Sequence, residues 1–444
     1  MSEGKIKIGL LTFSLPSERI DLAKKFGKDA ATSLQSLGFE LIESDGLIYT
    51  SDESITAAAK HADMGASCVI MALGSWMFTP AVVDAVRKID LPFAIWAEDN
   101  PASFSLTAGG IVHGSLDELG LKHRFFYGSL HSEELLKEIA AFIRACGAAK
   151  DLKEDKLCVI GGRVKGMYTT MADMIQIKNV FGLEIEHIDT LRVYLEAKKV
   201  PIQKVSETIK WLGEEFGRIN VDQKFVEKSA RLYIALKDIL TKTGYNIAAI
   251  KCQDELINNY SSCCLPISLL NDDGFTVSCE SDIYAAITMR ILSLVSGGVS
   301  LFGDINHLDQ KERVLRIVNC GTMPSLMADN RKDVDLELQY EYMGQARGIT
   351  TAFCVRESPM TVARLCRIKG KFVLFAAEGH TQKVEKERFK ETREAWPHVF
   401  VKLSCDMKKL IQSFRSNHVH ACFGNHLDDL KEFCSLKDIE ILIP

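Results

Sequence analysis

Hydrophobic and polar positions follow two different periods along roughly the first 300 residues. Short apolar runs, typical of buried parallel strands, alternate with longer segments of helical period. Residues 68–73 form one such run, and a segment with proline in its first helical turn starts at Pro80. This alternation predicts parallel α/β layers of the Rossmann or flavodoxin type. The predicted strands are 6–11, 39–42, 68–73, 92–96, 156–160 and 248–253, and the predicted helices are 19–37, 54–64, 80–89, 132–146 and 264–270, with a helical region at 201–243.

The pattern changes from about Gly297 onward. Short runs bounded by Gly or Pro at 350–355, 361–367, 371–376 and 398–401 predict antiparallel strands of a smaller β-rich, barrel-like domain. A chain of 444 residues is too long for one compact core. We therefore expect three domains. They are an N-terminal flavodoxin-like α/β domain at 1–149 that ends in a linker at 147–151, a second α/β domain at 150–296 that carries Glu280, and a β-rich C-terminal domain at 297–444 that carries Asp304 and His418.

The stretch from Cys279 to Asp304 is the centre of this organisation. Glu280 and Asp304 bracket a segment whose apolar residues recur at the spacing of a helix with one buried face, and this segment ends at Gly297-Gly298. Strand-like residues flank it on both sides, which predicts a βαβ unit with both strand ends at one edge of a parallel sheet. Two carboxylates that meet there either hold a hard divalent cation or share a proton. Alternatively, Glu280 only caps the helix and Asp304 only begins a turn.

Histidines near the C-terminus offer a third ligand. His418 and His420 are two positions apart, so on a strand their side chains face the same side. His418 follows Asn417 where a loop and a strand meet, and it is either a metal ligand or a structural side chain. His380 is a weaker candidate of the same kind. The Gly161-Gly162 turn after the strand at 156–160 either cradles an anion or only reverses the chain.

Composition excludes several classes of function. The 54 basic and 59 acidic residues are interleaved and give a formal charge of −5. A nucleic-acid-binding protein typically has a concentrated excess of basic residues instead. No apolar run approaches the ~20 residues that cross a bilayer, and the N-terminus lacks the pattern of a signal peptide, so we expect a cytoplasmic protein without membrane partners. The 13 cysteines form no CxxC pair, which favours free buried thiols. Dinucleotide and P-loop glycine motifs are absent, so no organic cofactor is expected.

Four motifs, in the family's order, resemble the L-fucose isomerase family, which includes L-arabinose isomerase-like relatives. They are FTVSCESDIYAAITM, SLFGDINHLD, VNCGT and NHVHACFG, and the resemblance covers most of the chain, including GGRVKGM. The resemblance implies two α/β domains, a β-rich C-terminal domain and an enzyme that interconverts aldoses and ketoses. It also implies a divalent ion, usually Mn²⁺, held by Glu280, Asp304 and His418. It further implies a homo-oligomer, a trimer or hexamer, in which the N-terminal domain of one subunit closes the pocket of another. On that pattern Trp76 lies over a neighbour's sugar; alternatively, it is a buried core residue.

One departure concerns the number of metal ligands. Asn319 stands in VNCGT, where some arabinose isomerase-like members carry a fourth metal-binding histidine, so the resemblance favours three protein ligands. Such a site suggests isomerisation through a cis-enediol, with the cation as Lewis acid and Glu280 and Asp304 as acid and base. Gln253, Asn319 and Asn417 are candidates for contacts with sugar hydroxyls.

Two other functions stay open at this point. One is a different metal-enediolate enzyme, an epimerase or an aldolase. The other is a sugar-binding protein, because paired α/β domains also form hinged solute-binding clefts, although that function predicts a secretory signal. The identity of the small-molecule sugar is open too. A 6-deoxy sugar, a pentose, or a sugar with an anionic group at carbon 6 such as a sulfonate all agree with the sequence.

Overall fold

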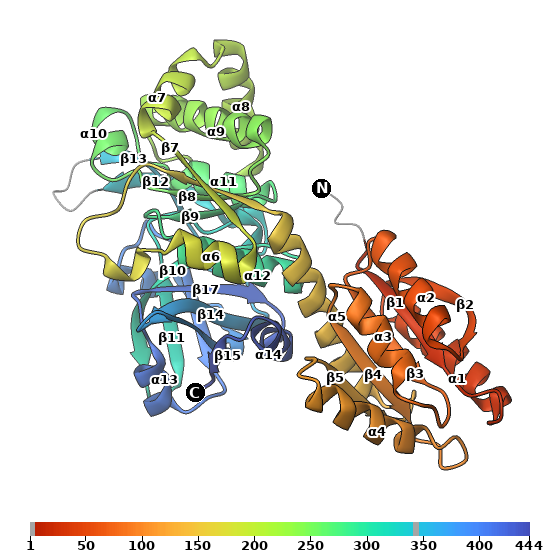
Figure 1. Cartoon of the computed structure of the whole chain (residues 1–444). Coiled ribbons are helices and arrows are strands. Elements are labelled where there is room, and N and C mark those ends of the chain that lie inside the picture. Colours follow the sequence, from red (N-terminus) through yellow and green to blue (C-terminus); the bar gives the residue numbers. More distant parts are fainter. Residues whose placement is uncertain (1–4, 341–345) are drawn as a thin grey trace. The chain divides into compact units, whose positions relative to one another are not determined.

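The computed structural model describes residues 5–340 and 346–444 (Figure 1). The chain divides into two compact units, Met1–Lys150 and Asp151–Pro444.

The first unit is a five-stranded parallel sheet with helices on both faces. Its strand order, β2-β1-β3-β4-β5, is that of flavodoxin-like folds, so the predicted class is confirmed. The apolar residues of α2, α3 and α4 pack on one face of the sheet. On the other face, Phe26 of α1 meets Trp96 at 5.6 Å and Phe142 of α5 meets Phe126 at 6.0 Å between ring centroids. The elements are β1 (Lys7–Phe13), α1 (Ile20–Ser36), β2 (Glu40–Ile48), α2 (Ser51–Asp63), β3 (Cys68–Leu73), α3 (Pro80–Lys88), β4 (Phe93–Glu98), α4 (Ser105–Glu118), β5 (Arg124–Gly128) and α5 (Glu133–Glu154).

The predicted linker at 147–151 coincides with the division between the two units, but it is part of a helix. Helix α5 continues through it to Glu154, and the division between the two units falls inside this helix. The sequence there is Gly-Ala-Ala-Lys-Asp, and its small residues are buried, with Gly147 against Ile6. A glycine that looks like a linker residue therefore serves close packing of the helix.

The second unit begins with a four-stranded parallel sheet in the order β7-β6-β8-β9. Helices α7, α9, α11 and α12 contribute to its core. The elements are β6 (Lys156–Ile160), α6 (Met174–Phe181), β7 (Glu184–Ile188), α7 (Thr190–Lys199), α8 (Ile202–Glu215), α9 (Gln223–Thr243), β8 (Ile247–Ile250), α10 (Glu255–Asn259), α11 (Cys264–Asp272), β9 (Thr276–Cys279) and α12 (Ile283–Ser296), with a 3₁₀ turn at Tyr168–Thr170.

A closed six-stranded antiparallel barrel follows, as predicted for the β-rich region. The strand order is β14-β17-β10-β11-β16-β15, and β14 pairs with β15 to close it. Strand β18 adds to β15 in parallel, and β12 and β13 form a separate pair. Inside the barrel lie apolar side chains of all six strands, among them Leu301, Ile317, Val362, Phe375, Val399 and Val419. The elements are β10 (Ser300–Asp309), β11 (Val314–Val318), β12 (Asp335–Tyr340), β13 (Ala346–Ala352), β14 (Pro359–Ile368), β15 (Lys371–Thr381), β16 (His398–Leu403), α13 (Met407–Ser413), β17 (His418–Phe423), α14 (Leu427–Leu436) and β18 (Glu440–Leu442), with 3₁₀ turns at Ser325–Met327, Arg331–Asp333 and Lys386–Glu391.

The predicted βαβ unit around α12 is wrong in its second strand. β9 belongs to the parallel sheet, whereas β10 runs antiparallel to β17 and β11 in the barrel. Helix α12 packs against β8 and β9 on one side and against β14, β17 and β10 on the other. It is therefore buried around most of its circumference, and not on one face only. A stretch of helical period followed by a strand cannot reveal which sheet the second strand joins.

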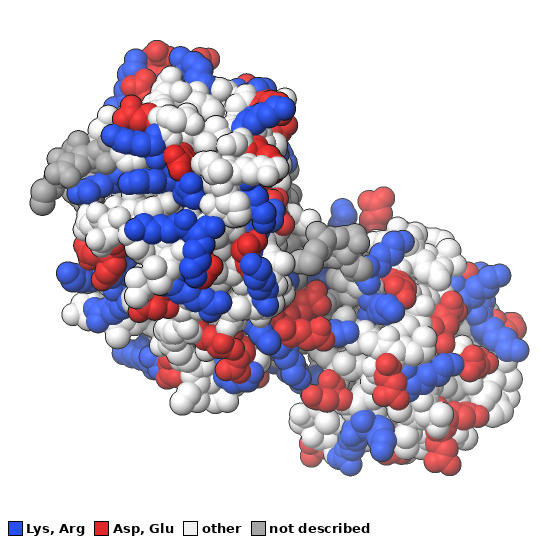
Figure 2. Space-filling view, turned by 90° about the horizontal axis from the view of Figure 1, so that it is seen from above, with Lys and Arg blue, Asp and Glu red and all other residues white. Residues whose placement is uncertain are grey.

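Three general expectations can be checked against this fold. No described helix is long and apolar enough to cross a membrane. On the face of the molecule in Figure 2, acidic and basic side chains are interleaved, in keeping with the small net charge. All 13 cysteines are free thiols, and ten of them are buried.

Close contact between β10 and β11 requires a glycine next to Asp304. A Cβ atom on Gly303 would overlap Cγ2 of the buried Ile317. We expect Gly303→Ala to lower the free energy of unfolding by about 1–3 kcal/mol, the usual effect of overpacking. The check is the urea denaturation midpoint. Gly298→Ala is the matched control, because the nearest atom to its Cβ, Ser296 Oγ, is 3.8 Å away. Equal midpoints for the two variants would contradict this packing argument.

Candidate active site

Glu280 lies in the tight connection between β9 and α12. Glu280 and Ser281 both have left-handed backbone conformations, with φ of 61° and 50°. Non-glycine residues pay of order 1 kcal/mol or more for such conformations, and they are concentrated at functional sites. The Glu280 carboxylate has two partners, because Gln253 Nε2 donates to Oε1 over 2.8 Å and His418 Nε2 lies 2.9 Å from Oε2. The strained turn thus ends in a carboxylate with a defined orientation.

The barrel brings the other two predicted ligands together through strand register. Asp304 on β10 is the cross-strand partner of His418 on β17. Asp304 Oδ1 lies 3.6 Å from His418 Nε2, so the imidazole nitrogen is shared between two carboxylates. The Asp304 side chain is 36% exposed and that of Glu280 18%, whereas His418 is fully buried. Glu280 and Asp304 therefore both lie close to His418 Nε2, at the boundary of sheet and barrel.

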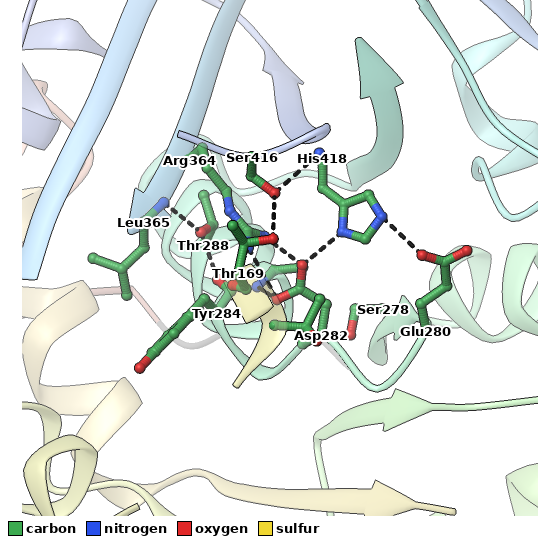
Figure 3. A network of polar contacts seen from close by, with 12 residues as sticks. Thr169, Ser278, Glu280, Asp282, Tyr284, Thr288, Arg364, Leu365, Ser416 and His418 are labelled. Atoms are coloured by element: carbon green, nitrogen blue, oxygen red, sulfur yellow. Dashed lines mark hydrogen bonds and ion pairs between the residues drawn. The ribbon is translucent and has the colours of Figure 1, made fainter. Parts of the chain in front are cut away.

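The imidazole of His418 is held from its far side by Asp282 (Figure 3). Its Nδ1 lies 2.7 Å from Asp282 Oδ2. Burial alone would lower the pKa of His418, but the hydrogen bonds to Asp282 and Glu280 raise it to about 9. Burial raises the pKa of Asp304 to about 6, with Glu280 adding to the shift and His418 opposing it. The site thus concentrates negative charge around one nitrogen.

Asp282 and Arg364 are site residues that our sequence analysis missed. Asp282 caps α12, because its Oδ1 accepts from the backbone N–H of Ala285 over 2.9 Å. It also binds the Arg364 guanidinium of β14 at 2.7 Å. Burial opposes ionisation, yet Arg364 and His418 hold the pKa of Asp282 well below its usual range. Figure 3 shows these residues together, with Thr169 and Ser416 beside them.

Sequence signals for both missed residues existed. An Asp just before an apolar helical run is a typical N-cap, so Asp282 and not Glu280 should have been assigned that role. An arginine inside an otherwise apolar strand, as in TVARLC, implies a buried partner for its charge. His420, on the same strand as His418, is buried and close to Arg364, with 3.1 Å between Nε2 and Nη1. Burial, aided by the Arg364 charge, lowers the pKa of His420 well below its ordinary value.

The predicted sugar-contact residues have different surroundings. Gln253 binds Glu280, and Asn417 Nδ2 donates to Asp304 Oδ1 over 3.0 Å, so both adjoin the carboxylates. Asn319 is buried; its Oδ1 accepts from the backbone of Gly321 and Thr322, and its side chain also hydrogen-bonds Asp304. Trp76 belongs to the first compact unit, where it is half-buried beside Phe78. The structure therefore brings six of the seven predicted residues together.

The donor set suits a divalent cation. Two carboxylates and one imidazole nitrogen are typical ligands of Mn²⁺ and similar ions. The second nitrogen of His418 is bound by Asp282, and such a carboxylate behind a ligating histidine fixes its orientation in many metal sites. The residues therefore fit the ion that the family resemblance implies.

Comparisons with known proteins find sugar isomerases. The family model for the L-fucose isomerase C-terminal domain matches residues 317–443. A sulfoquinovose isomerase from Alkalicoccus urumqiensis is 22% identical over 312 residues, covering 67% of this chain and 70% of that protein. One from Clostridium sp. (strain MSTE9) is 24% identical over 335 residues, covering 73% of each. A solved periplasmic solute binding protein from Actinobacillus succinogenes 130z, with bound D-allose, aligns at a TM-score of 0.18 and 12% identity over 66% of this chain and 93% of that chain, which is too low to support any inference.

Fold, family match and relatives together define a class of enzyme, the sugar isomerases that interconvert aldoses and ketoses. Within that class, residues 317–443 are similar to the C-terminal domain of L-fucose isomerase, and the relatives that match about two thirds of the chain are sulfoquinovose isomerases.

Charge on Asp282 should control the protonation of His418. In metal-free protein, we expect Asp282→Asn to lower the His418 pKa from about 9 toward its ordinary 6.5, as measured by NMR titration of the imidazole. A raised histidine pKa stabilises the fold below pH 6.5, and this contribution is lost as pH rises through 9. The variant should lose that pH dependence, and about 3–5 kcal/mol of stability, because Arg364 becomes a buried charge without its carboxylate.

Asp428→Asn is the matched control for this experiment. Asp428 pairs with Lys431 on the surface and its side chain is 74% exposed, so its loss should change stability by less than about 1 kcal/mol. An unchanged His418 pKa in Asp282→Asn would contradict the role assigned to Asp282.

Proposed function

We propose that this isomerase is metal-dependent, that it acts on a sugar with a sulfonate at carbon 6, and that it works through a cis-enediol. The observation that carries the mechanism is the convergence of Glu280 and Asp304 on His418 Nε2, at 2.9 and 3.6 Å. Glu280, Asp304 and His418 would hold the ion. When bound, a divalent cation supplies polarisation of the sugar carbonyl and compensation of developing negative charge.

Proton movement is the task of the two carboxylates. One carboxylate accepts the proton from carbon 2 of the aldose, and the pair of electrons left behind forms the double bond between carbons 1 and 2 as the carbonyl oxygen gains a proton. The hydroxyl at carbon 2 then loses its proton while carbon 1 receives one, which yields the ketose. Gln253 fixes Glu280 over 2.8 Å and Asn417 fixes Asp304 over 3.0 Å, so both carboxylates are oriented before substrate binds.

Support for a sulfonated substrate begins with the relatives, which are named sulfoquinovose isomerases. Exposed cations near the site add to it. Arg163 and Lys165 follow β6 at the carboxyl edge of the parallel sheet. Lys165 Nζ lies 3.8 Å from Oδ2 of Asp254, which directly follows Gln253, the partner of Glu280.

The spacing of the sheet agrees with a substrate of this length. Strand β8 separates β9, which leads to Glu280, from β6, which leads to Arg163. Two strand spacings amount to about 10 Å. An extended six-carbon sugar whose carbonyl lies at Glu280 has its sulfonate at a comparable distance, within reach of the side chains of Arg163 and Lys165. These cations would recognise the sulfonate by charge-assisted hydrogen bonds.

We further propose a homo-oligomer, a trimer or hexamer, in which a neighbouring subunit helps to close the pocket. Exposed aromatic side chains on the first unit support this assembly. Phe78 is 63% exposed beside Trp76, and Phe104 is 59% exposed. Apolar surface of this kind at the carboxyl edge of a parallel sheet is typical of a contact or ligand surface.

Removing either carboxylate should abolish isomerisation. We expect Glu280→Gln and Asp304→Asn each to lower kcat at least about 100-fold, as loss of an acid–base group does. The assay uses Mn²⁺-loaded enzyme with 6-deoxy-6-sulfoglucose, glucose or L-fucose, and carbon NMR identifies the product. Ketose made in D₂O should carry deuterium at carbon 1, from the enediol.

The control for this assay is Glu312→Gln, an exposed carboxylate of the barrel. Activity above a few per cent in Glu280→Gln or Asp304→Asn would refute the assignment. A carbon-2 epimer or a cleaved sugar as product would instead identify an epimerase or an aldolase.

Recognition of the sulfonate can be tested separately. We expect Arg163→Ala and Lys165→Ala to raise KM for the sulfonated aldose about tenfold or more, because each removes a charged hydrogen-bond donor. The same variants should leave KM for an uncharged aldose unchanged. Lys210→Ala, an exposed lysine on α8, serves as the control for a loss of surface charge. Equal changes with charged and uncharged sugars would exclude these residues as the sulfonate site.

A further inference from the structure

A second group of metal-ligand side chains lies in the first compact unit. His113 and Asp117 are four residues apart on α4, and His123 lies just before β5. One donor atom from each of these three residues lies within 4.8 Å of the other two. His113 Nδ1 and His123 Nε2 are 2.7 Å apart, and His113 Nε2 lies 3.6 Å from Asp117 Oδ2.

The histidine from the loop is oriented in advance. The Nδ1–H of His123 donates to the backbone carbonyl of Leu121 over 2.8 Å, which directs the lone pair of Nε2 toward His113. Phe93 stacks on the His123 ring with 5.9 Å between centroids and an angle of 11°. Phe125 packs on the His113 ring at 5.3 Å. A hydrogen bond to the non-ligating nitrogen and fixed ring planes are the usual supports of a histidine metal ligand.

The helix that carries two of these residues is intrinsically weak. α4 contains Gly109, Gly110 and Gly114, and each glycine inside a helix costs about 1 kcal/mol relative to alanine. Phe104 at its N-terminus is left-handed, with φ of 54°, and its side chain provides no cap. A link between the end of α4 and the entry to β5 would therefore stabilise the least favourable helix of this unit.

We propose that His113, Asp117 and His123 form a binding site for a borderline divalent metal ion, of which Zn²⁺ is the first choice. Two imidazoles and one carboxylate are ligands that Zn²⁺ binds in tetrahedral sites, and water completes the shell. The ion clamps α4 to the connection that leads into β5. This site lies in the first unit, whereas Glu280, Asp304 and His418 lie in the second.

Hydrogen exchange of the full chain tests this proposal with a readout that does not depend on activity. Zn²⁺ should slow amide exchange in residues 105–128 of the native protein. The Zn²⁺ affinity obtained from this protection should fall at least about tenfold in His113→Ala and in His123→Ala. Loss of an outer-shell partner alone lowers metal affinity by that factor. Total bound Zn²⁺, measured by equilibrium dialysis and mass spectrometry, should decrease by one equivalent in both variants.

His131→Ala is the matched control, because His131 is an exposed histidine of the same unit. It should keep both the protection and the bound equivalent. Asp117→Asn, at a ligand whose side chain is 64% exposed, should likewise weaken the protection by Zn²⁺. Protection by Zn²⁺ that is the same in His123→Ala as in native protein, or no Zn²⁺-dependent change in residues 105–128, would overturn the proposal.

Discussion

The carboxylate of Asp282 holds the second unit of this protein together at its functional end. One side chain caps α12, binds Arg364 on β14 and orients His418 on β17. All three charged groups are almost completely excluded from solvent. Buried charges are costly unless every one has a partner, so displacing either the helix or a barrel strand would leave an uncompensated charge. The parallel sheet and the barrel are thus fixed relative to each other at the place where the carboxylates meet.

Helix α12 is held in place by packing along its whole length. It is packed between the parallel sheet and the barrel, and its residues are buried on nearly every side. Because so much packing fixes the helix, the connection before it can tolerate two left-handed non-glycine residues. That strained connection begins with Glu280, whose carboxylate lies 2.9 Å from the buried His418. The packing of α12 therefore offsets the strain of the connection, and it fixes the orientation of the Glu280 carboxylate.

Electrostatics at the site follow from this geometry. His418 faces Asp282 on one side and Glu280 and Asp304 on the other, so a positive charge at this position is strongly favoured. A proton on the imidazole supplies this positive charge, as the raised pKa of His418 indicates. A divalent cation between the two carboxylates would supply it as well, with the His418 lone pair as its third ligand. The site that favours an imidazolium is thus also one that suits a metal.

Periodicity and composition determined much about this protein by themselves. The alternating buried strands and helices predicted both parallel sheets, because residues 68–73 and 156–160 must be covered on both faces. Short runs with glycine boundaries predicted the β-rich C-terminal part, and ordered motifs indicated the family. Glu280, Asp304 and His418 were chosen from motif and residue type. Only the tertiary structure showed that β10 leaves the parallel sheet, that cross-strand register puts Asp304 opposite His418, and that Asp282 and Arg364 support them. Local patterns record which residues are buried and how they repeat, but the pairing of strands far apart in the chain depends on packing between whole elements, which no single stretch of sequence contains.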